Sequence, residues 1–328
     1  MHNHCRKIVA ICLAMVLFMA ATVANASHGN ENGTAKKAIV LTAFGTSYPE
    51  ALVSILSIQK TVQKAFPKIP VKLAFTSNII RKIWIERSQD KAWQKAHPEV
   101  PAEVLHVKTP LATIADLQNQ GYRDITVQSL HVFAGEEYQD TANMVQGLRS
   151  IHALKPRHTP FTRLELGRPA LGMPGEAHPY KTDLAIAAKT LKADVEQARK
   201  MDAALVYMGH GNDFFSTGIY AEFQTVLQKE YGWPVIIGCV EGFPGFDQAL
   251  AALKVSGKKK VLLKPLMIVA GDHANNDMAG DEDDAWKTML TKAGFTVKAE
   301  LRGLGVVPEW AQLYVVHLKD AMTQKAAQ

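Results

Sequence analysis

The chain has 328 residues, 47% of them hydrophobic, and a formal net charge of +6. This length and composition can bury a large core, as one domain or as two. The charge excess is small and scattered, which excludes an extended nucleic-acid-binding surface. Cys5 and Cys12 lie near the N-terminus and only Cys239 follows. Once the N-terminal segment described next is removed, no intramolecular disulfide can form.

The first 26 residues are typical of a secretory signal peptide. Arg6 and Lys7 provide positive charge, residues 8–23 are an apolar run, and residues 24–26 read Ala-Asn-Ala, a small-residue cleavage site. We therefore predict export to the periplasm and no membrane span after cleavage. An uncleaved anchor is the alternative, but the apolar run is short for a bilayer span. A lipoprotein is disfavoured because the residues before Cys12 do not resemble a lipobox.

Residues 27–37, rich in Gly, Asn and Ser, predict a flexible lead-in. From there on, short apolar, β-branched runs alternate with longer stretches of helical period, which is typical of parallel sheets covered by helices on both faces. Strands are expected at residues 38–43, 71–75, 124–132, 164–166, 203–208, 234–239, 260–269 and 296–301. Helices expected between them include residues 49–66, 110–120, 136–149, 180–199 and 281–293.

Two blocks of the first half of the chain recur in the same order in the second half. Residues 129–137 (SLHVFAGEE) align with residues 265–273 (PLMIVAGDH), and residues 38–47 align with residues 204–213. Buried strands share an apolar alphabet and can match by chance. Two matched blocks in the same order nevertheless favour an internal duplication.

The duplication predicts an α/β fold of two similar Rossmann-like halves, residues 38–170 and 171–328, each a parallel sheet flanked by helices. Ligands of open parallel sheets gather beyond the carboxyl ends of the strands. Pockets also form where two lobes meet. We therefore expect an active-site cleft between the halves, lined by residues that follow the strands.

Three successive strands of the second half are each followed by an ionisable residue close to glycine: His210, Glu241 and His273. Glycine lets the backbone turn sharply and allows a bulky planar partner to approach. Two imidazoles and one carboxylate suit a divalent first-row metal, and three ligands leave coordination positions open. Each residue alone has a plainer interpretation, a core or capped histidine or, for Glu241, a partner of a helix dipole near Phe246. Their convergence favours a metal site.

The first half lacks these histidines. In the internal alignment Phe44 takes the place of His210 and Glu137 the place of His273, so we expect the second half to hold the metal and the first half to provide a wall. The candidate substrate-binding residues of that wall follow the opening strand and are Phe44, Gly45, Thr46 and Ser47. The alternative for this segment is a helix start, because Ser47 and Glu50 have the spacing of a capping box.

Together these residues resemble a known family, the anaerobic, ATP-independent (class II) sirohydrochlorin cobaltochelatases, which are relatives of ferrochelatases. The resemblance covers nearly the whole mature chain. It is carried by LTAFGTS at residues 41–47, MGHG at 208–211, VEG at 240–242 and AGDHANNDM at 270–278. The resemblance implies that His210, Glu241 and His273 bind the metal and that both histidines act in its insertion. The signal peptide departs from the family pattern, since a corrin-pathway enzyme normally works in the cytoplasm.

We therefore expect insertion of Co²⁺, with Fe²⁺ as the other candidate, into sirohydrochlorin or a related tetrapyrrole. The pyrrole protons would be removed by His210 and His273, since imidazole can hold a cation and accept a proton near neutral pH. No phosphate-binding loop motif occurs, so no nucleotide is expected. The alternatives are a periplasmic metal- or haem-binding carrier without catalysis and a metal-dependent hydrolase. A homo-oligomer is expected.

Two further features carry weaker predictions. His97 precedes a proline and is expected at an exposed helix end, but in an exported tetrapyrrole-handling protein it is also a candidate axial haem ligand, at a subunit contact. Residues 281–284 read Asp-Glu-Asp-Asp. We interpret them as a helix N-terminus that complements the helix dipole, and the alternative is an entry funnel that concentrates cations.

Overall fold

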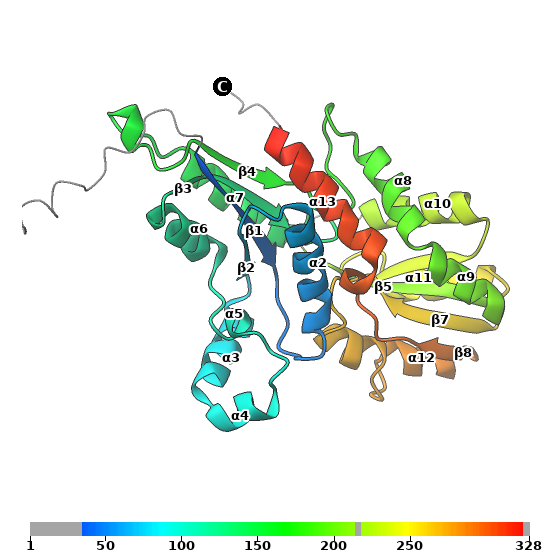
Figure 1. Ribbon diagram of the computed structural model, residues 1–328. Coiled ribbons are helices and arrows are strands. Elements are labelled where there is room, and N and C mark those ends of the chain that lie inside the picture. Colours follow the sequence, from blue (N-terminus) through cyan, green and yellow to red (C-terminus); the bar gives the residue numbers. More distant parts are fainter. Residues whose placement is uncertain (1–34, 214–217, 324–328) are drawn as a thin grey trace, which may run out of the picture. The chain divides into compact units, whose positions relative to one another are not determined.

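The computed structural model describes residues 35–213 and 218–323 (Figure 1). The predicted signal peptide and most of the predicted lead-in lie outside these residues. Contacts join the chain from Lys36 onward into one unit, and the first strand already begins at that residue, inside the predicted lead-in. Among the described residues, no helix combines the length and the apolarity needed to cross a bilayer.

The two halves contain four-stranded parallel sheets with the same strand order. The first sheet has the order β2-β1-β3-β4 and the second the order β6-β5-β7-β8. The strands are β1 (Lys36–Ala43), β2 (Val71–Phe75), β3 (Tyr122–Ser129), β4 (Arg163–Gly167), β5 (Ala203–Gly211), β6 (Val235–Glu241), β7 (Lys260–Pro265) and β8 (Thr296–Ala299). In each half the first strand lies between the second and the third. The predicted fold class of two similar α/β halves is therefore confirmed.

The strands alternate between two sets of core residues because successive side chains point to opposite faces of a sheet. In β1, Ile39 and Leu41 join one core and Val40 joins another. In β5, Tyr207 joins the core that contains Ile39, whereas Val206 joins a third core, separate from that of Val40. One face of each sheet thus packs into a core that both halves share, and the opposite face is covered separately.

Two strands end earlier than their apolar runs predicted. β3 ends at Ser129 and β7 at Pro265, although the apolar residues Leu130 and Leu266 just beyond them are fully buried. These residues lie in loops at the carboxyl ends of the strands. An apolar run reports burial, not ladder hydrogen bonding, so its length overestimates the strand.

The helices of the described chain are α2 (Leu52–Ala65), α3 (Asn78–Gln89), α4 (Lys91–Ala96), α5 (Ala102–Leu105), α6 (Pro110–Asn119), α7 (Glu136–Arg149), α8 (Tyr180–Thr190), α9 (Lys192–Met201), α10 (Gly218–Tyr231), α11 (Phe246–Val255), α12 (Trp286–Lys292) and α13 (Pro308–Thr323). Short helical turns add η1 (Pro156–His158), η2 (Ala274–Met278) and η3 (Leu304–Val306). The helix predicted at residues 180–199 is two helices, because α8 ends at Thr190 and Leu191 separates it from α9.

The acidic residues 281–284 do not cap a helix. α12 begins at Trp286 and has no acidic residue in its first turn. Asp281 instead accepts a hydrogen bond from Lys287 at 3.0 Å, and Asp283 accepts one from Lys292 at 2.6 Å. The helix-dipole interpretation of this cluster is therefore wrong. Ion pairs with the lysines of α12 take its place.

The last helix, α13, packs against the first sheet although it comes from the far end of the chain. It contacts α2, β3 and β4, as Figure 1 shows for the red helix beside α2. Trp310 and Tyr314 are fully buried there, and the Tyr314 hydroxyl donates to the backbone oxygen of His131 at 3.2 Å. The first sheet is thus completed by a helix that follows the last strand of the second.

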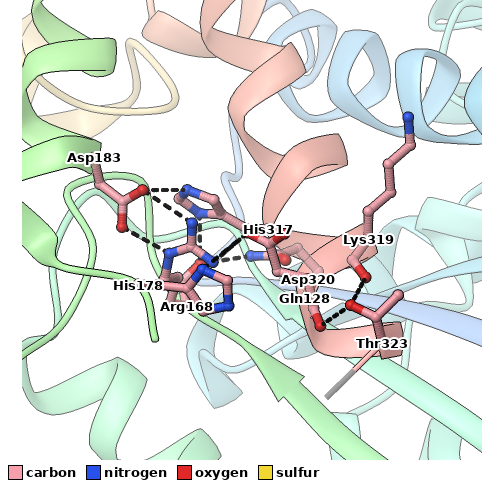
Figure 2. Close-up of polar contacts among 8 residues, drawn as sticks. All are labelled: Gln128, Arg168, His178, Asp183, His317, Lys319, Asp320 and Thr323. Atoms are coloured by element: carbon pink, nitrogen blue, oxygen red, sulfur yellow. Dashed lines mark hydrogen bonds and ion pairs between the residues drawn. The ribbon is translucent and has the colours of Figure 1, made fainter. Parts of the chain in front are cut away.

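A buried ionic network fixes the crossover between the halves (Figure 2). Arg168, directly after β4, donates from Nε and Nη2 to the two carboxylate oxygens of Asp183 in α8, at 2.7 and 2.9 Å. Its Nη1 donates to Asp320 in α13 at 2.8 Å. His317 in α13 donates from Nδ1 to the backbone oxygen of Arg168 at 3.1 Å, and its Nε2 lies 3.3 Å from Asp183. Three segments distant in sequence therefore meet at one guanidinium.

Candidate metal centre

The three predicted metal ligands come from the carboxyl ends of adjacent strands. His210 is the penultimate residue of β5, and Glu241 is the last residue of β6. His273 follows the loop after β7 and immediately precedes η2. Because β5 lies between β6 and β7 in the sheet, the topology delivers all three residues to one edge.

The structure brings these side chains together. The ring centroids of His210 and His273 are 4.8 Å apart, with the rings edge to face. Glu241 Oε2 lies 3.9 Å from His210 Nδ1. The three side chains are 34% to 45% exposed, so a solute can reach them. His210 thus lies beside both of the other side chains, and the assignment of the three as metal ligands stays a prediction.

Both histidines are held so that the same nitrogen is available. His210 Nδ1 lies 2.9 Å from the backbone oxygen of Gly211, and His273 Nδ1 lies 2.8 Å from the carboxylate of Asp277. Each of these acceptors requires a proton on Nδ1, because neither can donate one. The lone pair of Nε2 is therefore left for a cation, an arrangement that is usual for metal-binding histidines.

The three candidate ligands do not surround one point in this structure. Within residues 35–213 and 218–323, no group of three or more His, Cys, Asp or Glu side chains is close enough to surround one ion. Glu241 is 45% exposed, and its carboxylate lies 3.9 Å from Nδ1 of His210, the nitrogen that Gly211 already engages. Metal binding therefore requires the side chains at the strand ends to rearrange. The backbone already places these residues at one edge of the sheet.

On the first half, the segment after β1 presents some of its predicted residues and buries others. Phe44 is 47% exposed, whereas Thr46 is 3% exposed and accepts a hydrogen bond from Trp84 Nε1 at its backbone oxygen. Ser47 also accepts at its backbone oxygen, from Arg87. The capping box predicted for Ser47 is absent, because α2 begins only at Leu52 with no side-chain cap. Phe44 and Ser47 remain able to touch a ligand.

The strand-end loops of the two halves contact each other at the candidate metal residues. The Tyr48 hydroxyl donates to Asp272, next to His273, at 3.0 Å. Opposite His210, a Cβ placed on Gly135 would lie 2.7 Å from the Asn212 side chain, so only glycine allows this approach. The two carboxyl edges therefore meet around the histidines.

Glu137 is a candidate functional residue that we aligned with His273 without assigning it a role. It lies in the first turn of α7, accepts a hydrogen bond from Thr76 Oγ1 at 2.5 Å and lies 3.6 Å from His131 Nε2. Burial would raise its pKa, but the nearby imidazole of His131, the hydrogen bond from Thr76 and the charge that His131 and His210 carry when protonated lower it overall. The carboxylate is thus kept ionised and faces His210 from the other half.

A family model described as "Cobalt chelatase (CbiK)" matches residues 37–323, nearly all of the described chain. The chain belongs to the CbiK cobalt chelatase family. A sirohydrochlorin cobaltochelatase of Salmonella typhimurium is 34% identical to it over 289 residues, which cover 88% of this chain and 97% of the relative. Sirohydrochlorin cobaltochelatase CbiKC of Nitratidesulfovibrio vulgaris is 30% identical over 288 residues, or 88% of this chain and 91% of that protein.

Solved structures show the same fold as this CbiK-family chelatase. The sirohydrochlorin chelatase SirB of Bacillus subtilis subspecies spizizenii, solved in complex with cobalt, superposes with a TM-score of 0.50 at 14% identity, over 87% of this chain and 95% of the other. DR2241 of Deinococcus radiodurans gives a TM-score of 0.50 at 12% identity, over 89% of this chain and 56% of the other. At these identities the likeness concerns the fold alone.

His97 lies outside the strand-end cluster of the chelatase, at the end of α4. Its Nδ1 lies 3.1 Å from Glu99, and its ring stacks on Trp93 with centroids 4.2 Å apart. The expectation of a partly exposed helix end is met. Haem binding at this residue stays a prediction.

Proposed function

We propose that this chelatase inserts Co²⁺ into sirohydrochlorin or a related tetrapyrrole without ATP, with His210, Glu241 and His273 holding the metal. The observation that carries the proposal is the orientation of the two histidines. Their rings lie edge to face at 4.8 Å, and both Nδ1 atoms are engaged, so Nε2 is the nitrogen of each ring that is left for a cation. The two relatives named for sirohydrochlorin supply the substrate class.

Metal and protons must move in sequence at this site. An Nε2 lone pair that binds the cation cannot accept a proton at the same time. Each histidine can therefore accept a pyrrole proton only after it has released the metal to a ring nitrogen that carries no proton. Glu241 offsets the charge of the cation before transfer. These ligands accept Fe²⁺ as well as Co²⁺, and preference between the two is set by geometry and supply.

The macrocycle would lie beside the strand ends, where flat apolar side chains are exposed. Phe44 is 47% exposed at the end of β1, and Phe243 is 63% exposed two residues after Glu241. Aromatic faces of this kind favour contact with the face of a flat ring. Ser47 is the candidate hydrogen-bond donor on the same side as Phe44.

The test is an anaerobic assay of purified protein with sirohydrochlorin and each divalent metal in turn, without nucleotide, followed by optical spectra. We expect many turnovers with Co²⁺, and a loss of kcat of more than about 100-fold in His210→Ala and in His273→Ala. His152→Ala, which removes an exposed histidine elsewhere, is the control. Full activity in either site variant would refute the assignment. A protein that binds Co²⁺ but never changes the tetrapyrrole spectrum would instead be the carrier considered above.

Three other expectations are proposals with narrower support. We propose export to the periplasm on the basis of the signal-like residues 1–26. The proposal of a homo-oligomer is not based on any contact between residues of this chain. An axial haem ligand at His97 is supported by the contact of its Nδ1 with Glu99, which leaves Nε2 as the nitrogen for iron.

A further inference from the structure

The first half contains a second acid–base cluster, which faces the metal ligands. It consists of Ser129, His131, Glu137 and Thr76. Ser129 Oγ lies 2.7 Å from His131 Nδ1, and it also accepts a hydrogen bond from the backbone nitrogen of His131 at 3.3 Å. On the far side of the ring, His131 Nε2 lies 3.6 Å from Glu137 Oε2. The imidazole is thus placed between a hydroxyl and a carboxylate.

His131 is fixed from behind by the last helix. The Tyr314 hydroxyl of α13 donates to the backbone oxygens of Leu130 and His131 at 3.3 and 3.2 Å. Among the described residues, His131 Nε2 is buried and has no hydrogen-bond partner, since 3.6 Å to the carboxylate is too long. Such an atom is unfavourable in a folded protein unless function retains it.

Glu137 connects this imidazole to the site. Thr76 and His131 both approach its Oε2, so Oε1 is the oxygen left to meet a substrate. The N-terminus of α7 favours the ionised carboxylate, and the charge of His210 acts on it from the other half. The two loops are close at this point, because a Cβ built on Gly135 would lie 2.7 Å from the Asn212 side chain.

We propose that His131 positions Glu137 and accepts from it a proton that Glu137 removes from a pyrrole nitrogen during metal insertion. The pyrrole N–H bond breaks, the proton goes to Glu137 Oε1, and the electron pair stays on the nitrogen and binds the incoming metal. Rotation of the carboxyl group then brings this proton to His131 Nε2, which holds it as an imidazolium. After the product leaves, the proton returns to solvent through Glu137, whose side chain is 39% exposed. No oxidation state changes.

This inference rests on the proposed function. It assigns metal binding to the second half of the chain and removal of a pyrrole proton to the first half. While the histidines of the second half still hold the cation, the carboxylate of Glu137 in the first half takes the first of the two pyrrole protons. The titratable groups that face His131 are Glu137 from α7 and Tyr314 from α13, with His210 beyond Glu137.

The test compares His131→Gln with His131→Ala, with His152→Gln as a matched control on the surface of the same half. Glutamine can still donate to Glu137 but cannot relay a proton at neutral pH. We expect kcat to fall about 10- to 100-fold in both variants while KM for Co²⁺ changes less than about two-fold. The acidic limb of the pH profile of kcat should move in both. Added to Glu137→Gln, His131→Gln should cause no further loss, because the two residues act as one unit.

A wild-type kcat for His131→Gln at every pH, or losses that multiply in the double variant, would overturn the inference. His210→Ala separates it from the proposed function. An inactive His210→Ala with a fully active His131→Gln rejects only the relay, whereas an active His210→Ala rejects the metal site itself. Thermal unfolding checks each variant. If His131→Gln does not fold, His131→Asn, which keeps a polar partner for Ser129, carries the same comparison.

Discussion

Asp277 decides which nitrogen His273 offers to a metal. Its carboxylate lies 2.8 Å from Nδ1, one helical turn away in η2. This contact fixes both the orientation of the ring and the tautomer in which Nδ1 carries the proton. It also increases the basicity of Nε2. The residue lies within the AGDHANNDM segment, whose role beyond the histidine itself could not be read from the sequence.

We predict that Asp277→Ala weakens Co²⁺ binding about 10- to 100-fold, because the His273 ring then loses the partner that fixes it. Titration of the purified protein with Co²⁺, followed by its visible absorption, measures this. Asp277→Asn should retain part of the affinity, since its amide oxygen still accepts from Nδ1. Asp283→Ala, an exposed acid nearby whose side chain pairs with Lys292, is the control and should bind normally.

Among single residues, the sequence indicated His210, Glu241 and His273 as candidate metal ligands, because each follows a predicted strand and lies near glycine. Glu137 was indicated only by the internal alignment, through its match to His273. A carboxylate in the first turn of a helix has an ordinary explanation in the helix dipole. Its approach to His210 depends on how two distant halves pack, which no local pattern contains.

Among the elements, the crossover after β4 depends on one carboxylate. Asp183 in α8 binds Arg168 through both oxygens and lies 3.3 Å from His317 Nε2 (Figure 2). Burial would raise its pKa, but these hydrogen bonds and charges lower it from 3.8 to about 2. The ionised form of Asp183 therefore stabilises the junction of β4, α8 and α13.

We predict that Asp183→Asn lowers the free energy of unfolding by about 3 kcal/mol near neutral pH, because the buried Arg168 then loses one of its two carboxylate partners. The folded-state pKa is depressed, so the stabilisation is present above the unfolded pKa of 3.8 and is lost as pH falls towards 2. The difference between the two pKa values corresponds to about 2 kcal/mol.

Denaturant unfolding between about pH 7 and pH 2 tests this. The gap in stability between wild type and Asp183→Asn should narrow as the solution becomes acidic. Asp116→Asn, at a half-exposed ion pair with Lys108, is the control and should change stability by less than about 1 kcal/mol. A gap that stays constant at every pH would contradict the role of the Asp183 charge.

Across the whole molecule, the duplication is visible in the identical strand order of the two sheets, but the halves are not independent in their contacts. One core contains Ile39 and Leu41 from β1, Leu205 and Tyr207 from β5, and Trp310 from α13. The boundary near residue 170 stays a prediction.

We predict that a fragment of residues 36–170 does not fold cooperatively by itself, because the face of the first sheet that α13 covers would be exposed. Trp310 and Tyr314 of that helix are fully buried in the intact protein. Circular dichroism during thermal unfolding should show no sharp transition for the fragment. Adding a peptide of residues 308–323 should restore part of one. A fragment that unfolds cooperatively without the peptide would show that the first half is self-sufficient.

The sequence by itself determined the α/β class, the eight strands and the duplication. Alternation of apolar residues and glycine at strand ends are local properties, and they already specify which residues follow each strand. It also singled out His210, Glu241 and His273 for the same reason. Only the tertiary structure decided that α13 returns to the first sheet, that Arg168 joins three segments, and that Glu137 of the first half approaches His210 of the second. These features depend on contacts between residues up to about 180 positions apart in the sequence. Such contacts contribute free energy only once both halves have packed.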